Sequence, residues 1–158
     1  LASGYFIGGA LGDFAFKRTN KGRILVSSVG VLFGAIFMYL AITTPIEATN
    51  QFFIWMCLTA LFMPLASANV IATVYDITVP EVRSTAQASE YFIENAGAAF
   101  APIITGVIAD AFDLKTAILL ICTVAWGLCF FFYLGALFTI DKDSQDLRNQ
   151  MADRAKSM

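Results

Sequence analysis

Four long apolar runs constrain the fold of this chain more than any other feature of its sequence. They cover residues 24–42, 52–75, 85–108 and 116–140, and three of them contain no charged residue. A helix needs roughly 20 apolar residues to cross the hydrocarbon core of a bilayer, which is about 30 Å thick. Because lipid offers no hydrogen bond to an unpaired backbone group, each run is predicted to be a membrane-spanning helix.

The composition supports a membrane protein. Hydrophobic residues make up 58% of the chain and charged residues 14%, whereas a soluble domain carries about 25% charged residues. Residues 1–12 are predicted to be part of a further membrane helix, with neither a signal peptide nor a basic segment before it. We therefore expect an all-α membrane protein, a polytopic helical bundle in the cell membrane, that is a fragment of a longer chain.

Two prolines predict where the helices end or bend. Pro45 follows the first full span and ends that helix because it lacks a backbone N–H. Pro64 lies near the middle of the second span, where it permits a kink. Gly30 and Gly34, one helical turn apart on the first full span, allow a neighbouring helix to approach closely.

The positions of the cations predict the orientation of the helices. Lys and Arg concentrate in cytoplasmic loops because they are costly to translocate. Nine of the ten cations fall on one side of the predicted spans, and only Lys115 falls on the other. Residues 141–158, a tail of mixed charge, are therefore predicted to be cytoplasmic and to be frayed or to lie on the surface. The nine cations are Lys17, Arg18, Lys21, Arg23, Arg83, Lys142, Arg148, Arg154 and Lys156.

The inventory of reactive side chains argues against an enzyme. The chain has no histidine, and its three cysteines, Cys57, Cys122 and Cys129, lie inside apolar runs as small hydrophobic residues. A zinc site and a histidine-based catalytic triad are therefore excluded, and no cofactor is expected. The net charge of −2, with the cations at helix ends, argues against a nucleic-acid partner.

The connection before the first full span carries a recognisable motif. Residues 8–23 read GGALGDFAFKRTNKGR. This resembles the loop signature of the major facilitator superfamily, G-x-L-[AG]-D-R-x-G-[RK]-[RK], although Phe14 replaces a cation and several extra residues precede the final Gly-Arg. The matching residues are Gly9, Leu11, Gly12, Asp13, Gly22 and Arg23.

A second connection strengthens the resemblance. Residues 76–86 read DITVPEVRSTA, which is similar to the connection between helices 10 and 11 of the superfamily. The resemblance implies a partial major-facilitator-type fold, from the end of helix 8 to helix 12, and the basic loop is most similar to spinster-like and related prokaryotic members. Helices 2 to 6 are an alternative placement because the two halves are structural repeats. The polar tail favours a true C-terminus.

The resemblance also implies a function. Its members are secondary transporters that move a small solute by alternating access. The expected partners are a small-molecule substrate, membrane lipids and the missing N-terminal half of the same chain. Spinster-like relatives suggest lipids as substrates, whereas other relatives move sugars, organic acids or drugs, and coupling to H⁺ is open. The alternative is a non-transporting helical membrane scaffold or receptor-like module.

The third span carries acids within its apolar run. Glu90 and Glu94 share one helix face with Gln87 and with small residues further along. A carboxylate inside a bilayer must pair with a cation, take up a proton or face water. We therefore hypothesise that Glu94, with Glu90, binds a proton or a cationic part of a substrate. The alternative is that these acids and Asn95 hydrogen-bond across an interface with the missing half.

Asn69, five residues after Pro64, is a further candidate. The resemblance places it on helix 10, which lines the transport cavity in the superfamily, so its amide is a candidate contact for a substrate. The alternative is that Asn69 satisfies the backbone of a kinked helix.

Opposite charges gather in the two cytoplasmic connections. In the superfamily, the signature aspartate and a nearby arginine form a latch that stabilises one conformation of the transporter. The resemblance carries this gating role to Asp13, Arg23 and Asp76, with Arg83 as a further member. The alternative is a set of solvated charges, each contributing well under about 1 kcal/mol.

Overall fold

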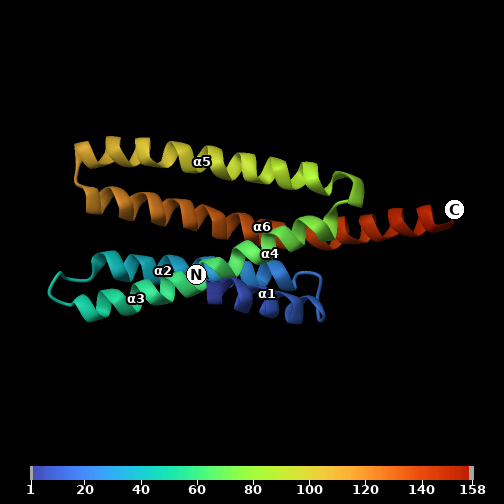
Figure 1. The fold of residues 1–158 in the computed structure, drawn as a ribbon, viewed down its shortest axis with the longest axis horizontal. Coiled ribbons are helices and arrows are strands. Elements are labelled where there is room, and N and C mark those ends of the chain that lie inside the picture. Colours follow the sequence, from blue (N-terminus) through green and yellow to red (C-terminus); the bar gives the residue numbers. More distant parts are fainter. Residues whose placement is uncertain (1, 157–158) are drawn as a thin grey trace.

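Helices account for nearly all of residues 2–156, the part of the chain that the computed structural model describes (Figure 1). No strand occurs within these residues, so the predicted all-α class is confirmed. Four helical segments in this part of the chain are long and apolar enough to cross a membrane. The elements are α1 (Ala2–Phe16), α2 (Gly22–Thr43), α3 (Thr49–Phe62), α4 (Pro64–Ile77), the 3₁₀ turn η1 (Pro80–Val82), α5 (Arg83–Ala111) and α6 (Leu114–Lys156).

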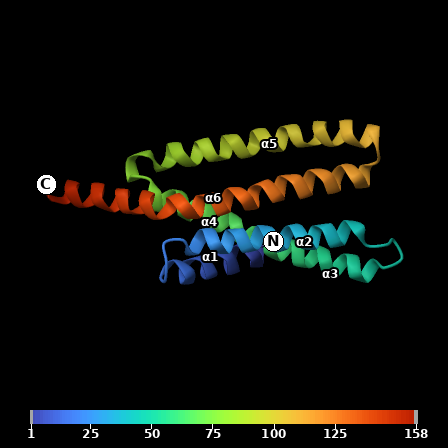
Figure 2. The same ribbon diagram turned by 180° about the vertical axis from the view of Figure 1, so that it is seen from behind.

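The helices form two layers that meet at α6. Helices α1 to α4 make one layer, and α2 contacts α1, α3, α4 and α6. Helix α5 runs beside α6 in both views, and its contacts with α4 and η1 are few (Figures 1 and 2). No residue of α5 is buried in this arrangement. Helix α2 is therefore the centre of the packing, and α5 is the most exposed of the long helices.

The second predicted span is divided at Pro64. Helix α3 ends at Phe62 and α4 begins at Pro64, with Met63 between them in helical conformation. Proline has no backbone N–H to donate to the carbonyl four residues earlier, so the hydrogen-bond ladder is interrupted at this residue. The break lies in the middle of the span, where the sequence permitted a kink.

Glycines let the helices on either side approach α4 closely. A Cβ atom on Gly8 of α1 would lie 2.6 Å from the Cα atom of Leu65. A Cβ atom on Gly30 of α2 would lie 2.9 Å from the Cβ atom of Leu65 in α4 and 2.9 Å from the carbonyl oxygen of Phe62 at the end of α3. Because the obstructing atoms include backbone, a side chain at these positions forces the helices apart.

Replacing Gly8 with alanine is therefore expected to destabilise the chain by about 1–3 kcal/mol, the range for overpacking a close helix contact. The matched control is Gly97→Ala in α5, because no atom lies within 4 Å of a Cβ atom at Gly97. The control is expected to be neutral or slightly stabilising, since alanine favours helix. Unfolding in mixed detergent micelles measures both variants, and equal stability of the two would contradict the close contact.

Asp113 begins α6 at the end of the bundle opposite the basic connections. Its carboxylate accepts hydrogen bonds from the backbone N–H of Thr116, at 2.9 Å, and from the Thr116 hydroxyl, at 2.6 Å. These bonds to the ionised form hold the pKa of Asp113 below its ordinary value. The carboxylate thus caps the first turn of α6, where unpaired N–H groups favour negative charge.

The contribution of this cap to stability is expected to depend on pH. Because the pKa of Asp113 is lower in the folded chain, the ionised cap stabilises the fold at pH values above its ordinary pKa of about 3.9, and this stabilisation is lost as the pH falls through the lower value. The difference in melting temperature between the natural chain and Asp113→Ala should thus be larger at pH 7 than at pH 3. A difference that grows on acidification would contradict this account.

Helix α6 does not end at the membrane-spanning run. The sequence predicted a frayed or surface-lying tail from residue 141. Residues 141–156 continue α6 as one helix, so they are not frayed, and most of them are exposed; residues 157–158 lie outside the described part of the chain. Three contacts join this part of the helix to segments that are distant in sequence. Lys21 pairs with Asp141 at 3.1 Å. The other two contacts, Arg148 with Asn20 at 3.0 Å and Arg154 with Glu81 at 2.8 Å, lie further along the helix.

Candidate functional site

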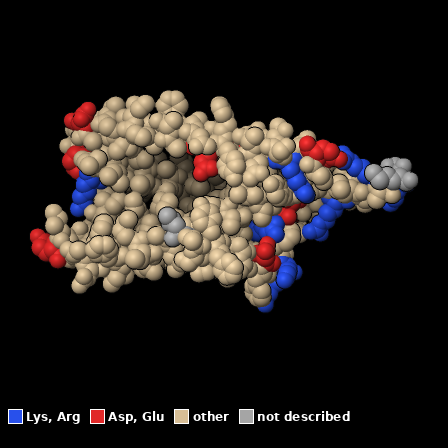
Figure 3. Space-filling model, viewed as in Figure 1, with Lys and Arg blue, Asp and Glu red and all other residues tan. Residues whose placement is uncertain are grey.

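Glu90 and Glu94 line a cavity between the two layers of the bundle. They lie one turn apart on α5 and line a space of about 490 Å³ together with residues of α1, α4 and α6. Figure 3 shows acidic atoms beside a hollow in the middle of the molecule. The other lining residues are Tyr5, Ala66, Ser67, Val70, Ile71, Tyr91, Cys129 and Tyr133.

The lining of this cavity contains acids and hydrogen-bonding groups but no cation. Apart from the two carboxylates, its polar atoms come from three tyrosines, one serine and one cysteine. Two carboxylates on neighbouring turns repel each other when both are ionised. A carboxylate at this depth in a membrane needs a proton, a cation or water. The cavity can therefore hold a proton or a cationic group.

Gln87 lies next to the cavity and links α4 to α5. Its side-chain oxygen accepts a hydrogen bond from the Tyr75 hydroxyl at 2.8 Å, and its amide nitrogen donates one to the Tyr91 hydroxyl at 3.2 Å. Tyr91 itself lines the cavity. Gln87 is thus placed to orient Tyr91 rather than to contact a bound solute. Asn95 donates to the backbone oxygen of Tyr91 at 2.7 Å, within its own helix.

Asn69 lies between α1 and α4 and is not a lining residue of the cavity. Its side chain is 1% exposed, and its amide nitrogen donates to the carbonyl oxygens of Gly8, at 2.9 Å, and Leu65, at 2.7 Å. A Cβ atom at Gly12 would overlap the amide group of Asn69. This arrangement corresponds to the structural alternative that the sequence left open, because the amide satisfies the backbone of two helices.

Arg23 joins three helices at the end of the bundle that carries the basic connections. Its guanidinium donates to the carboxylate of Asp76 on α4 and, at 2.8 Å, to that of Asp13 on α1. It also donates to the carbonyl oxygen of Ala72 at 3.3 Å and lies 4.3 Å from the centre of the Phe16 ring. The side chains of Arg23, Asp76 and Asp13 are 15%, 22% and 65% exposed. We call these three residues the Arg23 cluster.

Arg83, which the resemblance grouped with these residues, and the nearby Glu81 make other contacts. Arg83 donates to the carbonyl oxygens of Tyr75, at 3.0 Å, and Thr78, at 3.3 Å, so it caps the end of α4. Glu81 pairs with Arg154 of α6. The structure therefore brings Asp13, Arg23 and Asp76 together, and it gives Arg83 a backbone-capping position beside them.

The signature glycines and their neighbours shape the turn that holds Arg23. Gly22 packs so closely on the backbone of Ala15 that a side chain there would overlap it. The Arg18 guanidinium lies 4.5 Å from the centre of the Phe14 ring, at the position where the signature usually has a cation. Gly9 has only Ala68 near its Cβ position, at 3.9 Å, and Leu11 is exposed.

The sequence did not identify the contribution of α6 to the cavity. Tyr133 and Cys129 line it, and both belong to the apolar run 116–140, which carries no charge. Their spacing of one helical turn places both residues on the same face of α6. The residues around them are apolar, so the sequence shows no polar stripe that would identify this face. Within residues 2–156 no three Cys, Asp or Glu side chains are arranged to hold a metal ion.

The sequence matches a known protein family over nearly its whole length. The family model described as Major Facilitator Superfamily matches residues 1–156, which is nearly the whole chain. This is a family of transporters rather than enzymes. No solved structure matches the chain.

Proposed function

Because the chain belongs to the Major Facilitator Superfamily, we propose that it is the C-terminal half of a secondary transporter that moves a small solute by alternating access and is coupled to protons through Glu94. The observation that carries the proposal is the cavity lined by Glu90 and Glu94 without a cation. An acid in such a place is costly unless its charge is neutralised.

Proton coupling follows from the chemistry of the cavity. When the cavity opens to water, Glu94 can ionise, and when water is excluded, a bound proton or a cationic group stabilises it. Alternating access exposes one site to each side of the membrane in turn. A carboxylate that binds a proton on one side and releases it on the other thereby links proton flux to the conformational cycle.

The exposure of α5 supports a partner half. This helix presents Glu90, Glu94 and a series of small residues, yet no residue within Arg83–Ala111 is buried by the rest of the chain. A membrane helix that exposes acids needs polar neighbours or water beside it. In the proposed transporter, the N-terminal half of the same protein covers this face and completes the cavity.

The Arg23 cluster acts as a latch in this proposal. It ties α1, α2 and α4 together, while the exposed carboxylate of Asp13 remains accessible to a group on an opposing helix. Figure 3 shows that nearly all visible Lys and Arg side chains gather at this end of the molecule. By the positive-inside rule this end, with the C-terminus, is cytoplasmic.

Solute uptake into proteoliposomes tests the proposed function. The full-length protein is reconstituted and supplied with labelled lipids, sugars, organic acids and amines, with and without an imposed pH gradient. Uptake that the gradient drives supports a proton-coupled transporter. Uptake at the same rate with and without the gradient would support a transporter but contradict proton coupling. If correctly folded protein takes up no solute of any class, the transporter proposal itself is contradicted.

A further inference from the structure

A small apolar cavity adjoins the cavity of Glu90 and Glu94. It has a volume of about 130 Å³ and lies between α2, α4 and α6, three helices that contact one another. Val70 and Tyr133 line both cavities, so their side chains form the boundary between the two. Because helices of this chain alone form the small cavity, it does not depend on the proposed N-terminal half. Its other apolar walls are Ile24, Val74, Ile77 and Ala136.

The small cavity is suited to an apolar group. Besides the tyrosine, two hydroxyl groups line it, and both donate to backbone carbonyl oxygens of their own helices. The Ser27 hydroxyl donates to Arg23 at 3.0 Å, and the Thr73 hydroxyl donates to Asn69 at 2.7 Å. An apolar cavity of about 150 Å³ in another protein stays free of water and binds benzene. A short alkyl chain therefore fits the small cavity.

The larger cavity is suited to an organic cation. Within residues 2–156, two carboxylates and no cation line it, so its charge is complementary to a positive group. The rings of Tyr5, Tyr91 and Tyr133 also line it, and the faces of aromatic rings attract ammonium groups. Its volume of about 490 Å³ is in the range of small-molecule sites and is larger than an inorganic cation requires.

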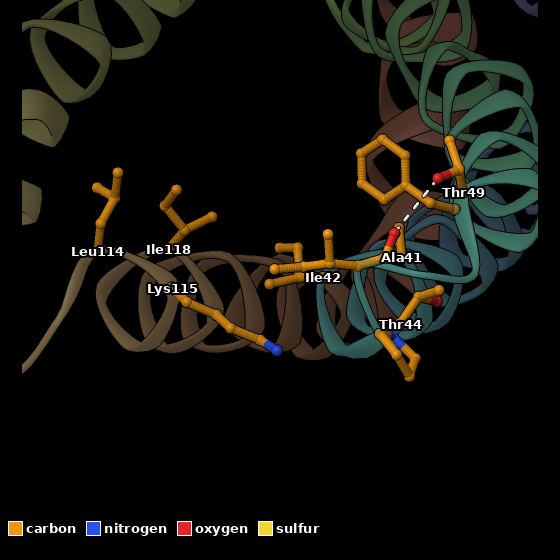
Figure 4. A pocket seen from close by; sticks show the side chains of 10 residues that line it. Ala41, Ile42, Thr44, Thr49, Leu114, Lys115 and Ile118 are labelled. Atoms are coloured by element: carbon orange, nitrogen blue, oxygen red, sulfur yellow. Dashed lines mark hydrogen bonds between the residues drawn. The ribbon is translucent and has the colours of Figure 1, made fainter.

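The cavity drawn in Figure 4 shows that this charge is specific to one site. That cavity, of about 610 Å³, lies where α2 ends and α6 begins, and it shares no lining residue with the other two. Its single charged lining residue is Lys115, whose side chain extends along α6 while Leu114 and Ile118 point to the other side of the helix (Figure 4). A positive group is repelled there and attracted to the two glutamates.

The positions of the two cavities along the bundle assign different roles to the glutamates. Ile24 and Ile77 of the small cavity directly follow members of the Arg23 cluster in sequence, so this cavity lies towards the basic connections. Helix α5 begins at the same end, which places Glu90 nearer to the small cavity than Glu94 is. A tail in the small cavity thus brings a positive head to Glu90 and leaves the Glu94 carboxylate for proton exchange.

On the basis of the transporter function proposed above, we propose that the solute is an amphiphilic ammonium compound. Its charged group pairs with Glu90 among the tyrosine rings, and its alkyl tail lies against Val70 and Tyr133 and reaches into the small cavity. The length of the tail then determines specificity, because each methylene group that leaves water strengthens binding roughly fourfold. The small cavity sets the upper limit of that length.

Binding of two quaternary ammonium probes tests the proposal. The full-length protein is purified in detergent and titrated calorimetrically with tetramethylammonium and butyltrimethylammonium, whose charge does not change with pH. We expect the butyl compound to bind about tenfold or more tightly, since three additional methylene groups are buried. Butyl sulfate, which has the same tail and the opposite charge, should not compete. Equal affinity for the two ammonium probes, binding of neither, or binding of butyl sulfate overturns the proposal.

Variants of the small cavity separate the tail from the head. Ala136→Leu fills the cavity and should lower the affinity for butyltrimethylammonium to that for tetramethylammonium, whose unchanged binding shows that the site is folded. Ala125→Leu makes the same change at an exposed position of α6 outside both cavities and should alter neither affinity. Val74→Ala enlarges the cavity and should favour hexyltrimethylammonium over the butyl compound. Unchanged tail selectivity in both cavity variants overturns the role of this cavity.

A variant of the head site and a transport assay complete the test. Glu90→Gln should weaken the binding of both ammonium probes about fivefold, since one of the two carboxylates remains. Unchanged affinity for both probes in Glu90→Gln contradicts the pairing with Glu90. Uptake of a sugar, an organic acid or a lipid by protein that binds neither ammonium probe overturns the substrate class but leaves the proposed transporter standing, so the two failures are distinguishable.

Discussion

Replacing Glu94 with glutamine is expected to abolish the uptake that a pH gradient drives in proteoliposomes of the full-length transporter, lowering its rate by roughly tenfold or more. Glutamine has nearly the size of glutamate and can form hydrogen bonds, but its amide does not ionise. Because Glu94 lines the cavity, its replacement removes the carboxylate without filling the space. The measurement is the initial rate of uptake with and without the gradient.

Glu90→Gln is the matched control for this experiment. It makes the same chemical change one turn away in the same cavity, at the end of α5 nearer the basic connections. We expect Glu90→Gln to lower the rate less and to keep its dependence on the pH gradient. If Glu94→Gln retains gradient-driven uptake at the natural rate, Glu94 is not the coupling residue, and its role is confined to the helix interface.

Replacing Arg23 with glutamine is expected to lower the free energy of unfolding by about 3 kcal/mol, because it leaves the partly buried Asp76 without its cationic partner. The substitution also removes the bonds that join α1, α2 and α4. Glutamine retains part of the polar surface of arginine, so the loss reflects the charge and the two guanidinium nitrogens that bond to separate carboxylates. Unfolding in mixed detergent micelles measures the difference.

Arg18→Gln is the control for the Arg23 cluster. Arg18 is exposed and its guanidinium lies over the Phe14 ring, so its loss should cost less than about 1 kcal/mol. Within the cluster, Asp76→Asn should destabilise the chain more than Asp13→Asn, since the side chain of Asp13 is mostly exposed. Equal stability of the Arg23 and Arg18 variants would mean that the cluster is a set of solvated charges.

Features that depend on local sequence were predictable. Each apolar run is long enough to fix a helix, and the missing N–H of Pro64 divides the second span wherever that helix packs. Asp13, Arg23 and Asp76 were also expected to gather, because the ends of neighbouring membrane helices meet at the same interface. In these cases the length of the apolar runs, the missing N–H of proline and the membrane interface determine the structure with few alternatives to it.

Features that depend on packing between distant segments were not predictable. Residues 141–156 have a composition typical of a frayed tail, but they are helical and contact Lys21 and Glu81, which are far away in sequence. Arg83 lies near Asp76 in sequence, and an ion pair between them was a reasonable expectation. In the structure, the guanidinium of Arg83 instead donates to backbone carbonyls at the end of α4. Tyr133 reaches the cavity only because α6 packs beside α5.

Because α6 is one continuous helix, its charged end must move together with its apolar part. No glycine or proline occurs in residues 136–156, so nothing in the backbone provides a hinge between the apolar part of the helix and its last turns. At 1.5 Å per residue, the segment 141–156 extends about 24 Å, and a tilt of about 10° displaces its tip by roughly 4 Å. In the proposed transporter, a spectroscopic label on this tip would therefore report the rocking that alternating access requires, away from the cavity of Glu90 and Glu94.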